Sequence, residues 1–229
     1  MDVDFKIDPE RIKSFIRRQG RATAGQRLAL ENLWDHYCLS PDKDYDLAEV
    51  FGRKAPLIVE IGFGNGSSLA DMAEANPDQD YIGIEVHRPG VGHLMMLLDE
   101  RQINNVRIYN HDAIEILEQK ITDASLAGVH LFFPDPWHKR RHHKRRIVRP
   151  SFLALLNKKL AVGAYFHAAT DWGDYAKEML ALLSADSGLQ NSSATGDFSP
   201  RPDYRPLTKF ENRGLKLGHG VWDLIFHKR

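Results

Sequence analysis

The sequence has only one cysteine, Cys38, among its 229 residues. A single cysteine excludes an intrachain disulfide and any zinc or iron–sulfur site that is built from several cysteines. No apolar run approaches the roughly 20 residues that a membrane-spanning helix needs. The first residues, Met1–Asp4, lack the positive charge and the apolar segment of a signal peptide. We therefore expect a soluble globular protein in the cytoplasm.

An excess of charge of either sign is also absent. Lys plus Arg and Asp plus Glu each number 31, so the formal net charge is zero. Overall charge therefore gives no reason to expect nucleic acid as a partner, and only a local basic cluster could do so. A metal site is not expected either, because the neighbouring histidines His138, His142 and His143 have no carboxylate or cysteine at metal-ligand spacing.

The chain length is typical of one domain, and we expect residues 1–229 to form it, with residues 1–50 as a helical N-terminal arm beside the core. A first helix is predicted after Asp8 and Pro9, with an apolar stripe along Ile12–Ile16. A second helix should begin at Thr23, where Gln26 completes a capping box.

From residue 57 onward, short apolar segments alternate with helical patterns. We expect strands at Leu57–Ile61, Tyr81–Glu85, Val106–Tyr109, Val129–Phe133, Tyr165–Ala169 and Val221–Phe226. Such alternation predicts an α/β fold with a mostly parallel sheet and helices on both faces. Residues Ser192–Pro206 contain three prolines and are expected to form a long exposed loop.

A glycine-rich turn follows the first of these strands, where Gly62, Gly64 and Gly66 let a ligand approach the backbone closely. The dinucleotide fingerprint places its third glycine three residues after the second, whereas here the spacing is two. Glu60 precedes the turn, and an anion there disfavours a pyrophosphate and favours a cationic ligand. S-adenosylmethionine, which carries a sulfonium and an ammonium, meets this requirement.

Acidic residues also follow the next two strands. Glu85 ends the second strand about twenty residues after the turn, where a carboxylate can accept hydrogen bonds from both ribose hydroxyls. Asp112 follows the third strand and could accept one from the adenine amino group. Either acid alone is compatible with a loop charge or a helix cap, but acids at three successive strands favour a ligand.

The fourth strand runs into Pro134–Trp137, in which Asp135 lies between two prolines and before an aromatic residue. Open α/β sheets bind ligands at this edge, so Asp135 is the candidate for the reacting centre. Seven Lys or Arg and no acid follow between His138 and Arg149. Such a positive field beside an acid and an aromatic indicates chemistry on nucleic acid. The RNA-contacting candidates are Arg140, Arg141, Lys144, Arg145 and Arg146.

Together these motifs resemble those of the bacterial tRNA (guanine-N7-)-methyltransferase family. The resemblance extends from about Gly20 onward and rests on the glycine turn, Glu85, Asp112, Pro134–Trp137, Lys139, Asp171 and Thr208–Glu211. It implies a Rossmann-like class I methyltransferase fold, with a mostly parallel seven-stranded sheet whose last strand is antiparallel. It also implies methyl transfer from S-adenosylmethionine to N7 of the variable-loop guanine at tRNA position 46.

The resemblance carries roles over to individual residues. Residues expected to contact the cofactor or the reacting centre are Glu60, Gly62, Gly64, Gly66, Glu85, Asp112 and Asp135. Residues expected to engage the substrate are Lys139, Asp171, Thr208, Lys209, Phe210 and Glu211. Guanine N7 has a lone pair and no proton, so the reaction needs alignment and a field that tolerates a cation rather than a general base.

Two other functions stay open at this stage. An amino-methyltransferase acting on adenine would also place an acid, a proline and an aromatic after the fourth strand, although usually with two adjacent prolines. A tRNA-binding protein without catalysis is the other alternative. The sequence leaves the oligomeric state open. The N-terminal arm could be a solvated helix face, an RNA-contacting arm or a flap over the active site.

Overall fold

A computed structural model of the chain describes residues 12–15, 20–207, 211 and 220–229. Within them, strands form one sheet in the order β3-β2-β1-β4-β5-β7-β6. Strand β7 runs antiparallel to both of its neighbours, and the other pairs are parallel. The strands are β1 (Leu57–Ile61), β2 (Asp80–Ile84), β3 (Val106–Tyr109), β4 (Leu126–Phe132), β5 (Leu160–Thr170), β6 (Leu189–Asn191) and β7 (Trp222–Lys228). The predicted mostly parallel seven-stranded sheet is confirmed.

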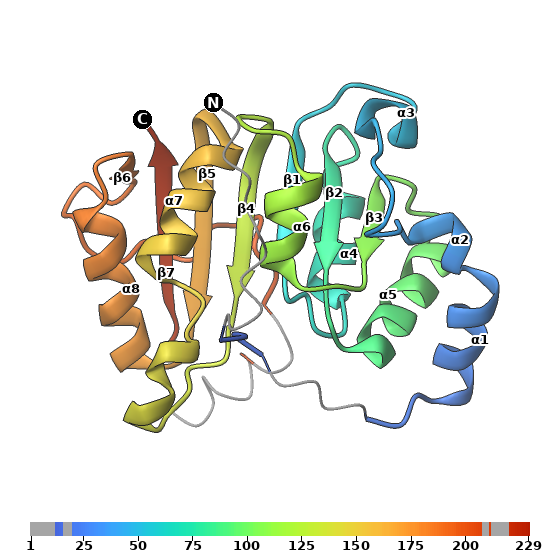
Figure 1. The fold of residues 1–229 in the computed structure, drawn as a ribbon, viewed down its shortest axis with the longest axis horizontal. Helices are drawn as coiled ribbons and strands as arrows, with labels where there is room; N and C mark the ends of the chain where they lie inside the picture. The colour runs from blue at the N-terminus through green and yellow to red at the C-terminus, as the bar shows by residue number, and fades with distance from the viewer. Residues whose placement is uncertain (1–11, 16–19, 208–210, 212–219) are drawn as a thin grey trace.

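Helices cover both faces of this sheet, with α6 and α7 in front and α4 behind in the view of Figure 1. The helices are α1 (Ala24–Asn32), α2 (Trp34–Tyr37), α3 (Leu47–Phe51), α4 (Ser67–Ala75), α5 (Arg88–Glu100), α6 (Ala113–Lys120), α7 (Pro150–Lys159), α8 (Gly173–Ala185) and the 3₁₀ helix η1 (Arg140–Arg145). In the described part of the chain, no helix is long and apolar enough to span a membrane.

The central strands are buried on both faces, which explains why their sequences are apolar without strict alternation. Val59 and Val129 belong to the hydrophobic core on the side of α6, α7 and α8, whereas Ile58 belongs to the core beneath α4 and α5. Strand β6, only three residues long, was not among the predicted strands. A segment this short carries too little periodicity to be recognised, and its pairing with β7 creates it.

Helix α1 begins at the predicted capping box, in which the side chain of Thr23 accepts from the backbone of Gln26 and the side chain of Gln26 accepts from the backbone of Thr23. The helix packs against α5 at two glycines. A Cβ at Gly92 would lie 2.7 Å from the carbonyl oxygen of Gln26, and one at Gly25 would lie 3.1 Å from the Met96 side chain. Glycine is thus what lets these two helices approach closely.

The prediction of a helix through Ile12–Ile16 is wrong for those of its residues that the structure describes. Residues 12–15 are non-helical, and the remainder of that predicted helix lies outside the described residues. The physical reason is tertiary contact, because the carbonyl oxygens of Lys13 and Ser14 accept hydrogen bonds from Arg145 and Trp137, far away in the sequence. The apolar stripe therefore did not decide the local conformation.

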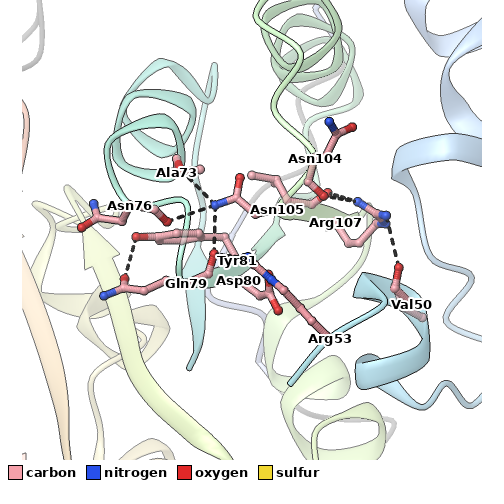
Figure 2. Close-up of polar contacts among 11 residues, drawn as sticks. Val50, Arg53, Ala73, Asn76, Gln79, Asp80, Tyr81, Asn104, Asn105 and Arg107 are labelled. Carbon is pink, nitrogen blue, oxygen red and sulfur yellow. Dashed lines mark hydrogen bonds and ion pairs between the residues drawn. The ribbon is translucent and has the colours of Figure 1, made fainter. Parts of the chain in front are cut away.

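The amino edge of the sheet, where its parallel strands begin, is held by polar contacts (Figure 2). The side-chain amide of Asn105 donates to the carbonyl oxygens of Ala73, Asn76 and Gln79, at 3.0, 3.2 and 2.9 Å. These bonds tie the residue before β3 to the end of α4 and to the turn that follows it. Arg53 bonds Asp80 at 2.6 Å and ties the chain after α3 to β2. The contacts at this edge stabilise the fold. The edge at which a ligand is expected is the opposite one.

The segment between β6 and β7 has no regular secondary structure up to residue 207, as predicted for Ser192–Pro206, but it is not exposed throughout. Arg205 is only 1% exposed, which corrects the expectation for that position. Its guanidinium is paired with buried carboxylates of Glu211 and Asp223, which is how an arginine can be accommodated in the interior.

Candidate active site at the carboxyl edge of the sheet

The candidate site lies where the sheet changes direction. From β1 the chain proceeds outward to β2 and β3, and then returns to β4 on the other side of β1. Ligands of open α/β sheets bind at the carboxyl ends of strands at such a point. A cavity of about 220 Å³ is found there, and its walls include Ser14, Phe15, Ile61, Gly62, Ile84, Glu85, Phe133 and Asp135. The structure thus brings Gly62, Glu85 and Asp135 to one space, as the sequence predicted.

The glycine turn after β1 has a left-handed backbone at each of its three glycines. Gly62, Gly64 and Gly66 have φ values of +71°, +62° and +76°. A Cβ at Gly62 or Gly64 would meet no atom of the described residues within 4 Å, so these residues leave open space around the two positions. At Gly66 a Cβ would lie 2.6 Å from Leu94, so this glycine permits packing against α5. Gly62 and Gly64 therefore form the part of the turn that a ligand can approach, and Gly66 packs the turn against α5.

Glu60 is a buried carboxylate without a complete set of partners. Its side chain belongs to β1 and is 2% exposed, and its Oε2 atom has no hydrogen-bond partner within the described part of the chain. Burial, and next the nearby carboxylate of Glu85, raises the pKa of Glu60 to about 8. A buried acceptor that lacks a partner is costly, and a cationic group placed beside it would relieve that cost. The donor chemistry of this position fits a cationic ligand.

The next two acids are already engaged with the backbone. Glu85 accepts from the amide of Gly64 at 2.9 Å and from those of Val86 and His87 at 2.7 and 2.8 Å. Its carboxylate therefore fixes the glycine turn. Oε1 already accepts two of these bonds, whereas Oε2 accepts one and retains acceptor capacity. Asp112 is buried and caps α6 by accepting from Ile114 at 2.9 Å. Its neighbours in the sequence, His111 and Ala113, line the cavity. Asp112 therefore lies at the edge of the cavity, where the adenosine part of the cofactor is expected.

Asp135 is held in an exposed loop with unusual backbone geometry on both sides. Phe133 and Trp137 have φ values of +51° and +50°, a left-handed conformation that is costly for bulky aromatic residues. The amide of Phe133 donates to the carbonyl oxygen of Ala169 on β5 at 2.7 Å. With prolines at 134 and 136, this backbone has little freedom. The loop thus presents the Asp135 carboxylate to the cavity from a constrained position.

The described N-terminal residues lie against this loop. Ser14 and Phe15 line the cavity together with Asp135, and the indole nitrogen of Trp137 donates to the carbonyl oxygen of Ser14 at 3.2 Å. Figure 1 shows residues 12–15 as a short blue segment near the end of β4. This described part of the arm therefore contacts the Asp135 loop.

The basic segment after Trp137 forms η1, and its members differ in exposure. Arg140, Arg141 and Lys144 are exposed, whereas Arg145 is half-buried with its guanidinium 5.1 Å from the Trp137 ring centre. The expectation that Arg146 contacts RNA needs correction, because this side chain is 2% exposed. Its guanidinium bonds the carbonyl oxygen of Pro136 and pairs with Glu178, so it has no charge to present at the surface.

The residues expected to engage the substrate are distributed around the same edge. Lys139 is exposed at the start of η1, and half-buried Asp171 follows β5. Glu211 is buried and accepts two hydrogen bonds from Arg205. Thr208, Lys209 and Phe210 lie outside the described residues.

The sequence reasoning missed a buried polar network on the sheet face beneath the segment after β6. His167 lies 2.7 Å from Asp223, and the Tyr204 hydroxyl lies 2.8 Å from the other ring nitrogen of His167. Burial lowers the pKa of His167, and the neutral ring then donates to Asp223 and accepts from Tyr204. Arg205 also bonds Asp223, at 2.7 and 2.9 Å. The available signal was the histidine and aspartate within otherwise apolar strands.

Comparison with known proteins decides the family. A family model described as "Putative methyltransferase" matches residues 54–224. The tRNA (guanine-N(7)-)-methyltransferase of Methylococcus capsulatus is 56% identical over 96% of this chain and 95% of its own. That of Hydrogenovibrio crunogenus is 56% identical over 99% of this chain and 95% of its own. The chain belongs to the tRNA (guanine-N(7)-)-methyltransferase family. The resemblance indicated by the sequence motifs is confirmed.

A solved structure with the same fold extends this result. The crystal structure of the 16S rRNA methyltransferase KamB superposes with a TM-score of 0.60 at 14% identity, over 82% of this chain and 96% of its own. At that identity the likeness concerns the fold alone. The predicted Rossmann-like methyltransferase fold is thereby confirmed for this member of the tRNA (guanine-N(7)-)-methyltransferase family.

Proposed function

We propose that this chain transfers a methyl group from S-adenosylmethionine to N7 of the guanine at position 46 in the variable loop of tRNA. The observation that carries the proposal is the cavity at the switch point, where Gly62 of the glycine turn, Glu85 and Asp135 line one space. Glu60 lies on β1 two residues before Gly62, and its Oε2 has no hydrogen-bond partner among the described residues. The family to which the chain belongs supports the same reaction.

Residues in and around the cavity match the separate parts of the cofactor. When bound, S-adenosylmethionine supplies an electrophilic methyl group on a sulfonium. Glu60 would provide the anion for the positively charged amino-acid end, and Gly62 and Gly64 would allow close backbone contact. Glu85 would accept from the ribose hydroxyls and Asp112 from the adenine amino group.

On the substrate side, the protein has to align a base rather than remove a proton. Guanine N7 carries a free lone pair, and the base becomes positively charged when it is methylated. Asp135 is the residue that can accept hydrogen bonds from the guanine N–H edge or provide the negative field for the developing cation. Its constrained loop favours a fixed orientation, which is where most of the rate advantage would arise.

The exposed basic residues provide the positive charge that a polyanionic substrate needs. Arg140, Arg141 and Lys144 project from η1 next to the Asp135 loop, and Arg145 lies on Trp137. We assign them to the tRNA backbone, with Lys139, Asp171 and Thr208–Glu211 nearer the target nucleotide. Because α1 packs against helix α5, which covers the sheet, we propose that residues 1–229 form one domain. For a tRNA substrate we propose a cytoplasmic enzyme.

The test is incubation of the purified protein with radiolabelled methyl donor and bulk tRNA, followed by nucleoside analysis. We expect N7-methylguanosine in wild-type tRNA, and none in tRNA whose position 46 is changed to adenine. Labelled N6-methyladenosine would instead identify an amino-methyltransferase. A protein that binds neither the donor nor its demethylated product would be a tRNA-binding protein without catalysis.

A further inference from the structure

Arg146 differs from every other arginine in the basic segment after Trp137. It is 2% exposed, although Arg140 and Arg141 of η1 are exposed and Arg149 is exposed three residues later. A buried guanidinium is retained only where its charge and its N–H groups find partners. The partners of Arg146 therefore indicate what the residue does.

These partners come from three separate parts of the chain. The Nε atom donates to the carbonyl oxygen of Pro136 at 2.9 Å, and a terminal nitrogen pairs with the carboxylate of Glu178 on α8. The other terminal nitrogen lies 3.2 Å from Nε2 of His143 in η1. The guanidinium also lies 4.7 Å from the ring centre of Tyr175 on α8. Arg146 thus joins the Pro134–Trp137 loop, η1 and α8.

The bond to Pro136 acts on the residue next to Asp135. The loop has left-handed backbone at Phe133 and Trp137, and such geometry persists only where surrounding contacts impose it. A proline at 136 has no N–H, so its carbonyl is the backbone group through which the protein can hold this point of the loop. On the α8 side, Glu178 and Tyr175 give the guanidinium a fixed support.

We infer that Arg146 is a positioning residue, which fixes the Asp135 loop against α8 and at a set distance from the RNA-contacting side chains of η1. The inference rests on the proposed function. In this role Arg146 does not touch the substrate. It determines where the Asp135 carboxylate stands when tRNA is bound through Arg140, Arg141 and Lys144, so it couples the binding surface to the reacting centre.

The decisive variant is Arg146→Lys, which keeps a positive charge. One ammonium group cannot hold Pro136 and Glu178 together, because it lacks the planar set of donors. We expect its single-turnover rate, at saturating tRNA and S-adenosylmethionine, to fall about 100-fold, the loss that a displacement of roughly 1 Å can cause. Its cofactor affinity and the salt dependence of its tRNA affinity should equal those of wild type.

Glu178→Gln provides a second and milder variant, because it removes the ion pair and leaves the Nε–Pro136 bond in place. We expect a rate between those of wild type and Arg146→Lys. The matched control is Lys159→Gln, which removes a buried cation at the amino edge of the sheet, where Lys159 bonds Asp123 and the Ile121 carbonyl. It should lower the melting temperature without changing the single-turnover rate of the folded protein.

Each other outcome overturns the inference. If Arg146→Lys lowers the logarithmic salt slope by about 0.7–0.9 and leaves the saturated rate alone, Arg146 contacts phosphate. If it lowers only the melting temperature, its role is structural. Should Arg146→Lys fail to fold, an unchanged rate in Glu178→Gln overturns the inference. Failure of the proposed function is separate, because wild type would then form no N7-methylguanosine.

Discussion

The guanidinium of Arg205 donates hydrogen bonds to both carboxylate oxygens of Glu211, at 2.7 and 2.8 Å, and both side chains are almost fully buried. The same guanidinium bonds Asp223 on β7 and lies 5.7 Å from the ring centre of Phe133. Arg205 therefore connects the only described residue of the predicted Thr208–Glu211 motif, Glu211, to the sheet and to the residue that begins the Asp135 loop.

Replacement of Arg205 should destabilise the fold strongly. Arg205→Met leaves two buried carboxylates, those of Asp223 and Glu211, without their cation, which typically costs about 3–5 kcal/mol. The control is Arg101→Met, whose partners Asp71 and Glu74 are exposed and whose ion pairs should contribute only about 0–1 kcal/mol. Urea unfolding measures both. Equal losses in the two variants would mean that the buried network does not matter for stability.

Glu60 should make both stability and cofactor binding depend on pH. Because the pKa of Glu60 is raised to about 8, the folded protein keeps a proton between about pH 4.5 and 8 that the unfolded chain releases. Stability should therefore fall as pH rises through this window, by at most about 1.4 kcal/mol per unit, and level off above it. Glu60→Gln should remove this slope in thermal unfolding.

A cationic ligand favours the charged form of Glu60, so binding of S-adenosylmethionine should release a proton below pH 8. Its affinity should then increase with pH up to that value. Calorimetric titration in two buffers of different ionisation enthalpy measures the released proton. Proton release of the same size in Glu60→Gln would show that another group is responsible.

Asp135→Asn should separate catalysis from binding. The variant keeps the size and one acceptor oxygen but loses the negative charge, while Glu60, Glu85 and the exposed arginines remain. We expect turnover to fall by orders of magnitude with cofactor and tRNA affinities nearly unchanged, the pattern of an interaction made mainly in the transition state. Single-turnover assays at saturation provide the measurement. A near wild-type rate would reduce Asp135 to a structural loop residue.

The exposed basic side chains should determine the salt dependence of tRNA binding. Replacing Arg140, Arg141 and Lys144 with glutamine should lower the slope of log affinity against log salt, by about 0.7–0.9 for each phosphate that the variant no longer neutralises. Cofactor affinity should stay the same, since the glycine turn is untouched. Filter binding over a salt series tests this, and an unchanged slope would mean that these side chains are merely solvated.

Much of the fold could be predicted because its determinants are local. Apolar segments between helical patterns indicated the central strands, and Thr23 with Gln26 indicated the start of α1. The glycine turn was predictable for the same reason, because its left-handed backbone requires residues without a Cβ. Parallel strands then bring their carboxyl ends to one edge, which explains why Glu85 and Asp135 could be placed together.

Tertiary structure alone decided which charges are buried. Arg145 and Arg146 are adjacent and identical, yet one lies over Trp137 and the other is enclosed beneath Pro136 and Glu178. Nothing in a basic run distinguishes them, because burial of a charge depends on partners that come from distant segments. The conformation of residues 12–15 and the burial of Arg205 have the same origin. The sequence by itself determined the central strands, the glycine turn and the edge of the sheet where the candidate site lies, whereas long-range pairing determined which arginines are buried and which remain exposed.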